Sequence, residues 1–267
     1  MSDILAKILA QKKLEVAELD SAALRRAAEA SLPPRDFLAA LQQPATKGSP
    51  RLIAELKRAS PSRGLIAAHL NLFDVADTYA ANGAAAISIL TDRKFFLGEL
   101  ETLRELRFTR KIALPLLRKD FIIHEAQLFE ARAAGADAVL LIAAALTDDA
   151  QFTDLHACAL SLGLTALVET HDAAEIERSL RLPGVNLIGI NNRNLSTFEV
   201  SLETSIRLRP LIPAGTCVVA ESAIFTRADV KRLANAGLDA VLVGEALMTA
   251  PDIAARVREL SGRGTGK

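Results

Sequence analysis

Glu55 and Lys57 are the first side chains along this sequence whose types and spacing suggest chemistry. They stand two residues apart in I-A-E-L-K-R-A-S-P-S-R-G (53–64), which begins as an apolar run and quickly becomes charged. On a strand they share one face with Ile53, while the residues between them take the other face. A buried carboxylate and a buried ammonium cost free energy unless they are paired or used. The simpler interpretation of an isolated E-x-K is a strand whose charged end meets solvent.

Polar side chains follow apolar runs at several other points. These runs end in S-I-L-T-D (88–92), L-L-R-K-D-F (116–121), V-E-T-H (168–171), I-N-N-R-N (190–194), A-E-S-A (220–223) and V-G-E-A (243–246). Carboxylates, ammoniums and amides are groups that enzymes use for acid–base catalysis. A purely structural protein does not need such endings to recur, so their convergence predicts a catalytic site.

The apolar runs predict eight strands that alternate with helices. The strands cover 51–57, 85–90, 112–118, 138–143, 165–169, 186–191, 216–221 and 240–244, and the helices include 71–82, 124–134, 148–162, 172–180, 202–209 and 226–236. Continuous apolar runs are typical of parallel strands covered on both faces. Gly83, Gly135 and Gly237 each end a helix before an apolar strand, at a regular spacing. We therefore expect an α/β fold, a (β/α)8 TIM barrel, with functional groups at the C-terminal ends of its strands.

The first 48 residues depart from this pattern. Apolar residues recur there at roughly helical spacing: Ile4, Ile8, Leu14 and Leu19. A second helix is expected at 22–30, and a short one begins near Asp36. We therefore divide the chain into a helical N-terminal extension (1–48), a lid or a plug, and a barrel catalytic domain (49–267).

Composition excludes several classes of function. Lysine plus arginine and aspartate plus glutamate number 32 each, so there is no overall bias toward nucleic acid or an anionic membrane. Aromatic residues make up 4% and tryptophan is absent, which argues against stacking on bases. The longest apolar run, 138–146, is too short to span a membrane, and the N-terminus lacks a secretory pattern. Isolated Cys158 and Cys217 are typical of reduced thiols in a cytoplasmic protein.

Several candidate residues also have structural explanations. Lys119 can form a solvated ion pair with Asp120, and Glu169 can cap the next helix, although Asp172 is better placed for that. Asn191 and the asparagines that follow it can form a turn.

The remaining polar positions have comparable alternatives. Glu221 and Ser222 can cap the segment that follows them, and His171 fits a surface loop better than a catalytic base. The other histidines show no ligand spacing, so no metal site is predicted: His69, His124 and His156.

Six motifs together resemble one enzyme family. They are I-A-E-L-K-R-A-S-P-S, L-P-L-L-R-K-D-F-I, A-L-V-E-T-H, I-G-I-N-N-R-N-L, V-A-E-S-A-I and L-V-G-E-A-L-M. In this order and spacing they look like indole-3-glycerol-phosphate synthase, and the resemblance also covers the helical extension. It implies a TIM barrel in tryptophan biosynthesis that needs no cofactor or metal. The implied reaction closes 1-(2-carboxyphenylamino)-1-deoxyribulose 5-phosphate to indole-3-glycerol phosphate, with loss of CO₂ and water.

The resemblance assigns roles to the polar strand ends. Lys119 is the implied general acid, which protonates the ketone oxygen during ring closure, and Glu169 is the implied base for dehydration. Lys57 matches a second lysine near the substrate carboxylate and phosphate, and which lysine donates at which step stays open. Glu55 and Asn191 are expected to orient the lysines and the sugar hydroxyls.

The other substrate contacts follow from the same resemblance. Arg193 and Ser60 suit the anthranilate carboxylate, and Phe121 and Leu195 are expected to wall the aromatic ring. Glu221 and Ser222 complete the set of expected substrate-binding residues.

The phosphate site is expected in the last two loops of the barrel, with Lys57 nearby. Backbone amides of Ser222, Ala223, Gly244 and Glu245 are expected to bind the phosphate, helped by a short helix. The family commonly has glycine where Ala223 stands, and alanine disfavours a positive φ, so we expect a modest cost there. Glu99 also stands where a small polar residue is commoner, which leaves the loop after the second strand undefined.

The two lysines also suggest how the site is charged. If Lys57 and Lys119 converge, each depresses the pKa of the other, while Glu55 and Glu169 oppose this effect. We therefore expect a balanced cluster of two positive and two negative charges in the free enzyme.

Three rival functions remain at this point. Phosphoribosylanthranilate isomerase is a related barrel, but its chemistry resembles a cysteine–aspartate pair, and the first strand here ends in Glu55 and Lys57 without a cysteine. A Schiff-base aldolase would use Lys119 as a nucleophile. A silent phosphate binder or an assembly subunit is the alternative outside enzymes. The expected partner is a phosphorylated small molecule, with no nucleic acid or membrane, and other enzymes of tryptophan biosynthesis are not indicated.

Overall fold

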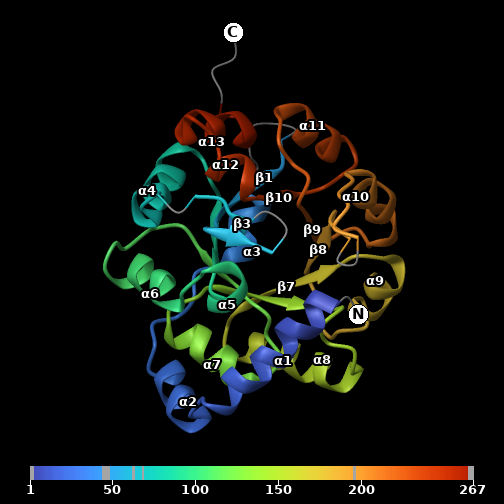
Figure 1. Cartoon of the computed structure of the whole chain (residues 1–267). Coiled ribbons are helices and arrows are strands. Elements are labelled where there is room, and N and C mark those ends of the chain that lie inside the picture. The colour runs from blue at the N-terminus through green and yellow to red at the C-terminus, as the bar shows by residue number, and fades with distance from the viewer. Residues whose placement is uncertain (1–2, 44–48, 62–63, 68, 195–196, 264–267) are drawn as a thin grey trace.

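A closed barrel of eight parallel strands forms the centre of the molecule, ringed by helices (Figure 1). The computed structural model describes residues 3–43, 49–61, 64–67, 69–194 and 197–263. Around the barrel the strands are β1 (Arg51–Leu56), β10 (Ala240–Val243), β9 (Cys217–Glu221), β8 (Leu187–Asn191), β7 (Thr165–Thr170), β6 (Ala138–Ile142), β5 (Leu116–Lys119) and β4 (Ala86–Leu90). The predicted TIM barrel is confirmed.

Helices follow the strands as the sequence predicts. They are α4 (Leu72–Asn82), α5 (Arg93–Phe96), α6 (Leu100–Phe108), α7 (Glu125–Ala133), α8 (Asp149–Ser161), α9 (Ala173–Ser179), α10 (Glu203–Leu208), α11 (Arg227–Asn235), α12 (Glu245–Met248) and α13 (Ile253–Ser261), with a 3-10 turn at Arg209–Leu211. The loop after β4 holds α5 and α6. The third strand starts at Leu116 rather than at 112, because Pro115 has no amide hydrogen to donate. A small hairpin, β2 (Ala59–Ser60) with β3 (Gly64–Leu65), forms in the loop after β1.

Side chains alternate between two apolar clusters, as expected for strands of a closed barrel. Ile53 belongs to the cluster inside the barrel, with Leu117 and Leu167 from facing strands. Ala54 and Leu56 belong to the cluster between the strands and the helices. The predicted division of this strand into two faces is therefore confirmed, and Glu55 points into the barrel interior, where Ile53 also lies.

The N-terminal helices run from one end of the barrel to the other. They are α1 (Asp3–Ala17), α2 (Ser21–Glu29) and α3 (Phe37–Gln42), and α2 lies beside α7 (Figure 1). Phe37 and Leu41 of α3 are buried in the cluster inside the barrel, next to Ala138 and Leu187, which begin their strands. Thus α3 closes the N-terminal end of the barrel as a plug. The boundary expected at residue 48 lies outside the described residues and remains a prediction.

The first helix has a different buried face from the one expected. Leu5, Ile8, Leu9 and Lys12 are buried, whereas Leu14 is 65% exposed. Leu19 lies beyond the last residue of the helix. The expected helix is confirmed, but the choice of Leu14 and Leu19 for its apolar stripe is wrong, because residues 5, 8, 9 and 12 form the face that contacts the barrel.

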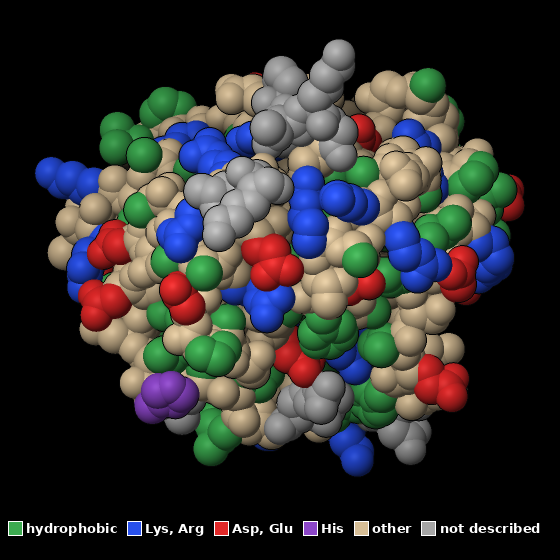
Figure 2. Space-filling model, turned by 90° about the horizontal axis from the view of Figure 1, so that it is seen from above, with side chains coloured by type: hydrophobic (Ala, Val, Ile, Leu, Met, Phe, Trp, Pro, Cys, Tyr) green, Lys and Arg blue, Asp and Glu red, His purple; other side chains and the backbone are tan. Residues whose placement is uncertain are grey.

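The surface shows no separation of charge on the face seen in Figure 2, where acidic and basic side chains are intermixed. This agrees with the equal totals of 32 basic and 32 acidic residues. Among the described residues, no helix has both the length and the apolar character that a membrane span requires.

Candidate active site

A cavity of about 180 Å³ opens at the C-terminal ends of the barrel strands. Residues from β1, β5, β7, β8, β9 and β10 line it, together with Leu5 and Ile8 of α1. Leu195 lies outside the described residues. Every other residue that the sequence predicts for the site lines this cavity: Glu55, Lys57, Ser60, Lys119, Phe121, Glu169, Asn191, Arg193, Glu221, Ser222, Ala223, Gly244 and Glu245. The predicted convergence of these residues on one cavity is therefore confirmed, whereas the role of each residue remains a prediction.

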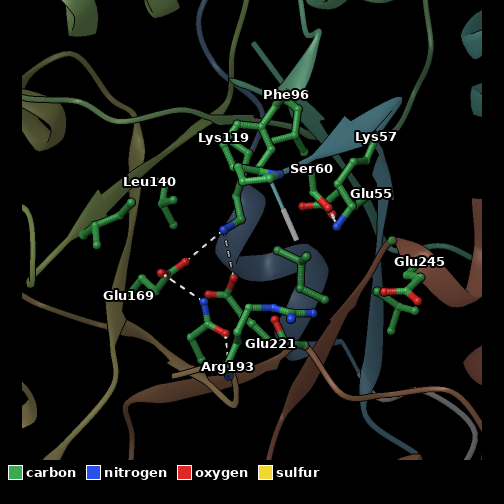
Figure 3. Close-up of a pocket in the computed structure, with 18 of the residues that line it drawn as sticks. Glu55, Lys57, Ser60, Phe96, Lys119, Leu140, Glu169, Arg193, Glu221 and Glu245 are labelled. Atoms are coloured by element: carbon green, nitrogen blue, oxygen red, sulfur yellow. Dashed lines mark hydrogen bonds and ion pairs between the residues drawn. The ribbon is translucent and has the colours of Figure 1, made fainter. Parts of the chain in front are cut away.

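Lys119 lies between two carboxylates at the centre of the cavity (Figure 3). Its Nζ is 2.9 Å from Glu169 Oε2 and 3.1 Å from Glu221 Oε2. Burial lowers the pKa of Lys119, but the attraction of Glu169, Glu221 and Glu55 outweighs burial and raises the pKa above its ordinary value. The opposition expected from Glu55 and Glu169 is therefore confirmed, and it determines the direction of the shift. The alternative pairing of Lys119 with Asp120 is wrong, because Lys119 Nζ contacts Glu169 and Glu221.

Both carboxylate oxygens of Glu169 contact other side chains. Oε2 faces Lys119, whereas Oε1 accepts a hydrogen bond from Asn191 Nδ2 at 3.2 Å and lies 3.3 Å from His171 Nε2. Burial raises the pKa of Glu169, but Lys119 and His171 outweigh it and hold the pKa well below its ordinary value. Asp172 caps α9, as the sequence favours, so the alternative role of Glu169 as the cap of that helix is wrong.

Glu221 is a third carboxylate beside Glu55 and Glu169, the two acids that the sequence analysis expected to balance the two lysines. Its Oε1 is buried without a hydrogen-bond partner among the described residues. Burial, with Glu169 and Glu55 close by, raises its pKa above the ordinary value despite Lys119. Gly189 makes room for it, since a Cβ there would lie 2.3 Å from Glu221 Oε1. The hypothesis of two positive and two negative charges did not include Glu221, a third acid beside the same ammonium. Because the pKa of Glu221 is raised to about 7, its charge near neutral pH is not fixed, and the balance of the cluster remains a prediction.

Glu55 and Lys57 form their own pair beside this cluster. Lys57 Nζ is 2.8 Å from Glu55 Oε2, and the two side chains are 19% and 5% exposed. A Cβ at Gly244 would lie 2.4 Å from the same oxygen. The pair therefore needs a glycine at position 244, directly after β10. Because both side chains are largely buried, the interpretation of a charged strand end in solvent is wrong.

The loop expected to bind phosphate has an unusual backbone. Ser222 and Ala223 have φ values of +66° and +60°, in the left-handed region that favours glycine. Asn192 holds the loop, because its Nδ2 donates to Ser222 O at 3.2 Å while its Oδ1 accepts from Ser205. The backbone shape associated with glycine is thus kept by an alanine, at the expense of local strain.

The walls of the cavity combine a guanidinium with aromatic rings. Arg193 N donates to Asn191 Oδ1 at 3.0 Å, and its Nη1 donates to Phe198 O at 3.3 Å. The ring centroids of Phe96 and Phe121 are 5.9 Å apart. Sequence reasoning missed Phe96 and Phe198, because Phe96 ends a helix of four residues and Phe198 lies in a loop, and neither segment is long enough to show a periodic pattern.

Two charged residues outside the cavity wall were also missed. His171 is only 13% exposed and lies 3.0 Å from Glu175 Oε2, so its assignment to a surface loop is wrong. The helical spacing of His171 and Glu175 was the available signal. Lys12 is 3% exposed and has Asp92 Oδ2 and Asp120 Oδ1 each at 2.9 Å from Nζ. A lysine on the apolar face of a helix was the signal for this second cluster.

Comparison with known proteins places the chain in a family. The family model "Indole-3-glycerol phosphate synthase" matches residues 5–260. An indole-3-glycerol phosphate synthase of Polaromonas naphthalenivorans (strain CJ2) is 48% identical over 98% of this chain and 100% of its own length. One from Roseiflexus castenholzii (strain DSM 13941 / HLO8) is 50% identical, again over 98% of this chain and 100% of its own.

Solved structures at lower identity share the fold. The 3-hexulose-6-phosphate synthase of Salmonella typhimurium superposes with a TM-score of 0.64 at 16% identity, covering 79% of this chain and 97% of its own. A mutant tryptophan synthase α-subunit from Pyrococcus furiosus gives a TM-score of 0.57 at 18% identity, covering 82% of this chain and 100% of its own. The family match over nearly the whole chain is the decisive comparison, and the chain belongs to the indole-3-glycerol phosphate synthase family.

Proposed function

We propose that this lyase of tryptophan biosynthesis closes the indole ring with Lys119 as its general acid and Glu169 as its general base. The substrate is 1-(2-carboxyphenylamino)-1-deoxyribulose 5-phosphate, and the products are indole-3-glycerol phosphate, CO₂ and water. The observation that carries these roles is the position of Lys119 Nζ, 2.9 Å from Glu169 and 3.1 Å from Glu221 inside the cavity.

The acid must be protonated when the substrate arrives. The carboxylates around Lys119 raise the pKa of its ammonium, which therefore carries its proton at neutral pH. Ring closure places negative charge on the ketone oxygen, and a proton from Lys119 Nζ neutralises that charge. Lys57, paired with Glu55 at 2.8 Å, is the second ammonium available to the substrate.

The base acts in the dehydration step. Loss of water removes a hydroxyl group and a proton, and Glu169 accepts that proton while an ammonium protonates the leaving hydroxyl. The low pKa of Glu169 keeps it ionised when the substrate arrives. Asn191 orients Glu169 through its 3.2 Å hydrogen bond, and it also lines the cavity that would hold the sugar.

The anthranilate part of the substrate fits the mixed wall of the cavity. Arg193 and Ser60 supply polar groups for its carboxylate, and Phe121 packs against its ring. Apolar residues on the same wall, including Phe96 and Leu140, reduce hydration of the carboxylate and favour its loss as CO₂. The assignment of Leu195 to this wall rests on the sequence alone.

The phosphate group is assigned to the residues that follow the last two strands. Ser222, Ala223, Gly244 and Glu245 line the cavity and can offer backbone amides, and Lys57 adds a positive charge. The left-handed backbone at residues 222 and 223 supports this assignment, because such turns direct successive amides toward an anion. The phosphorylated small molecule is the partner, and free thiols at Cys158 and Cys217 are consistent with a cytoplasmic enzyme.

The test follows the fluorescence of indole-3-glycerol phosphate after addition of the carboxyphenylamino substrate. Wild type and Lys119→Ala are compared with Lys231→Ala, a control for loss of an exposed lysine on α11. We expect full signal from wild type and the control, and a loss of at least about 100-fold in Lys119→Ala. Equal turnover by Lys119→Ala would refute the role of this lysine. Absence of turnover in wild type, with phosphate ligands still bound, would favour a silent binder.

A further inference from the structure

We propose that His171, anchored by Glu175, is a positioning residue that holds the carboxylate of Glu169 in its catalytic orientation. This inference rests on the proposed role of Glu169 and extends it to two residues that do not contact the cavity. The arrangement is a linear chain of three side chains, Glu175–His171–Glu169, from the surface of α9 to the end of β7.

The local sequence places the three groups in line. Glu169 lies near the end of β7, and Asp172 caps α9 so that the helix begins at Ala173. One turn into that helix, Glu175 Oε2 accepts a hydrogen bond from the amide of His171 at 2.7 Å and lies 3.0 Å from its Nδ1. The contact with Nδ1 holds the imidazole ring, and Nε2 lies 3.3 Å from Glu169 Oε1 as an ion-pair contact without hydrogen-bond geometry.

His171 acts through Glu169 rather than on a substrate. Among the described residues, Glu169 lines the cavity and His171 does not. The imidazole and Asn191 both approach Oε1 of Glu169, which leaves Oε2 facing Lys119 and the cavity. With contacts on both oxygens, the carboxylate has little freedom to rotate, and catalysis depends steeply on such orientation.

The charge on His171 explains why the site needs it. Lys119 is shared between Glu169 and Glu221, so one ammonium must serve two buried acids. Among the described residues, the charged groups in contact with the imidazole are Glu169 and Glu175. Burial lowers the pKa of His171, but these two carboxylates outweigh it and raise the pKa to about 10. An imidazolium at neutral pH therefore supplies Glu169 with a second positive neighbour, so that Lys119 can turn toward a substrate.

A purely structural role is the alternative. In that case the contact between His171 and Glu175 would only fasten the start of α9 to the barrel. Substitutions would then lower stability without changing the turnover of folded enzyme, and without changing its dependence on pH. The two explanations therefore differ in kcat and in the pH profile.

The experiment compares His171→Ala, His171→Gln and Glu175→Gln with the control Glu177→Gln. Glu177 lies on the same helix, but it pairs with exposed Arg181 and does not contact the chain of three residues. We expect His171→Ala to lower kcat about tenfold with KM changed less than about twofold, because orientation rather than binding is lost. His171→Gln should recover part of kcat, since its amide can donate to Glu169. Glu177→Gln should match wild type.

The pH profile gives a second readout. In Glu175→Gln the imidazole loses one of its two carboxylates, so its pKa falls and it becomes neutral at a lower pH. The alkaline decline of kcat should therefore move at least about one pH unit downward relative to wild type. An unchanged kcat in His171→Ala, or an unchanged profile in Glu175→Gln, would overturn the inference.

Nuclear magnetic resonance tests the chain without any assay of activity. In protein labelled with ¹⁵N-histidine, His171→Gln identifies the signal of His171, which should be that of an imidazolium at pH 8. A neutral ring at that pH would overturn the inference even in an active enzyme. If wild type shows the imidazolium but no turnover, the proposed function fails while the ion-pair chain stands.

Discussion

The two ends of the barrel are closed by two helices of the same extension, and the closures differ in kind. At the N-terminal end, Phe37 and Leu41 of α3 pack among apolar residues that begin the strands. At the C-terminal end, α1 places Leu5 and Ile8 over the cavity. There, Lys12 ties the helix to the barrel through two buried carboxylates. One closure completes the core, and the other builds a wall of the active site.

The difference teaches how one segment serves stability and function at once. Apolar packing does not depend on the charge of any group at the plug, so it does not change with protonation. An ion-paired tether depends on charge, and it joins α1 to Asp120, the residue after the proposed acid Lys119. Changes at the plug should therefore alter stability, and changes at the tether should alter both stability and activity.

The largest effect is expected at the plug. Phe37 is fully buried, so Phe37→Ala should lower the free energy of unfolding by about 3–5 kcal/mol, from lost burial and the cavity left behind. Urea unfolding measures this, with Leu32→Ala as the control because Leu32 is 66% exposed in the same extension. The folded variant should keep its KM. A raised KM would show that both ends serve the active site.

The tether is expected to give the next largest effect. Lys12→Met leaves Asp92 and Asp120 buried without this ammonium, which should cost about 3 kcal/mol of stability. KM should rise about tenfold as α1 loosens, the equivalent of about 1.4 kcal/mol. Lys13→Met, at an exposed position on the same helix, is the control. Stability lost without any change in KM would mean that α1 does not contribute to binding.

The pH dependence of the same variant sharpens this prediction. Burial raises the pKa of Asp120, but Arg118 and Lys12 outweigh it and lower the pKa to about 2, from an ordinary 3.8. The stabilisation is therefore full above pH 3.8 and is lost as pH falls toward 2. The difference in stability between wild type and Lys12→Met should shrink over that interval in acid unfolding. A constant difference would exclude Asp120 as its source.

Charge at the cavity gives a smaller effect, seen in the rate. Glu55 is one of three carboxylates that raise the pKa of Lys119, so Glu55→Gln should lower that pKa. The basic limb of the rate–pH profile should then move to lower pH, as measured by turnover across the alkaline range. An unmoved limb would mean that another group sets it.

The smallest effect is expected from the strained loop. Ala223→Gly keeps the backbone at a φ of +60° and removes the clash of the methyl group, so stability should rise by about 0.5–1 kcal/mol. Ala236→Gly is the control. Ala236 has a φ of −84°, which is ordinary for alanine, so glycine at this position should lower stability. Urea unfolding of both variants decides, and a loss of stability in Ala223→Gly would show that the loop is not strained.

Much of the barrel could be predicted from the sequence, because each strand is an apolar run and each helix has a local signal. The residues of the cavity could also be predicted, since parallel strands bring their C-terminal ends together whatever the details of packing. Lys119, Glu169 and Asn191 follow from that rule alone.

The partners of those residues could not be predicted in the same way. That Glu221 would share Lys119 with Glu169 depends on the absence of a Cβ at Gly189, a contact between neighbouring strands. That Lys12 would be buried depends on where α1 crosses the barrel. Charge balance in a cavity is a property of the assembled structure, and the sequence shows only its components.

Gly189 and Gly244 limit what can be made from this protein. In most TIM barrels, branched aliphatic side chains fill the interior, whereas here two missing methyl groups leave space for Glu221 and Glu55. Redesign for another substrate is therefore better directed at loop residues outside the proposed phosphate and carboxylate contacts. A library that also varies these two glycines will be dominated by inactive members, because the first carbon added at either position occupies the place of a carboxylate oxygen.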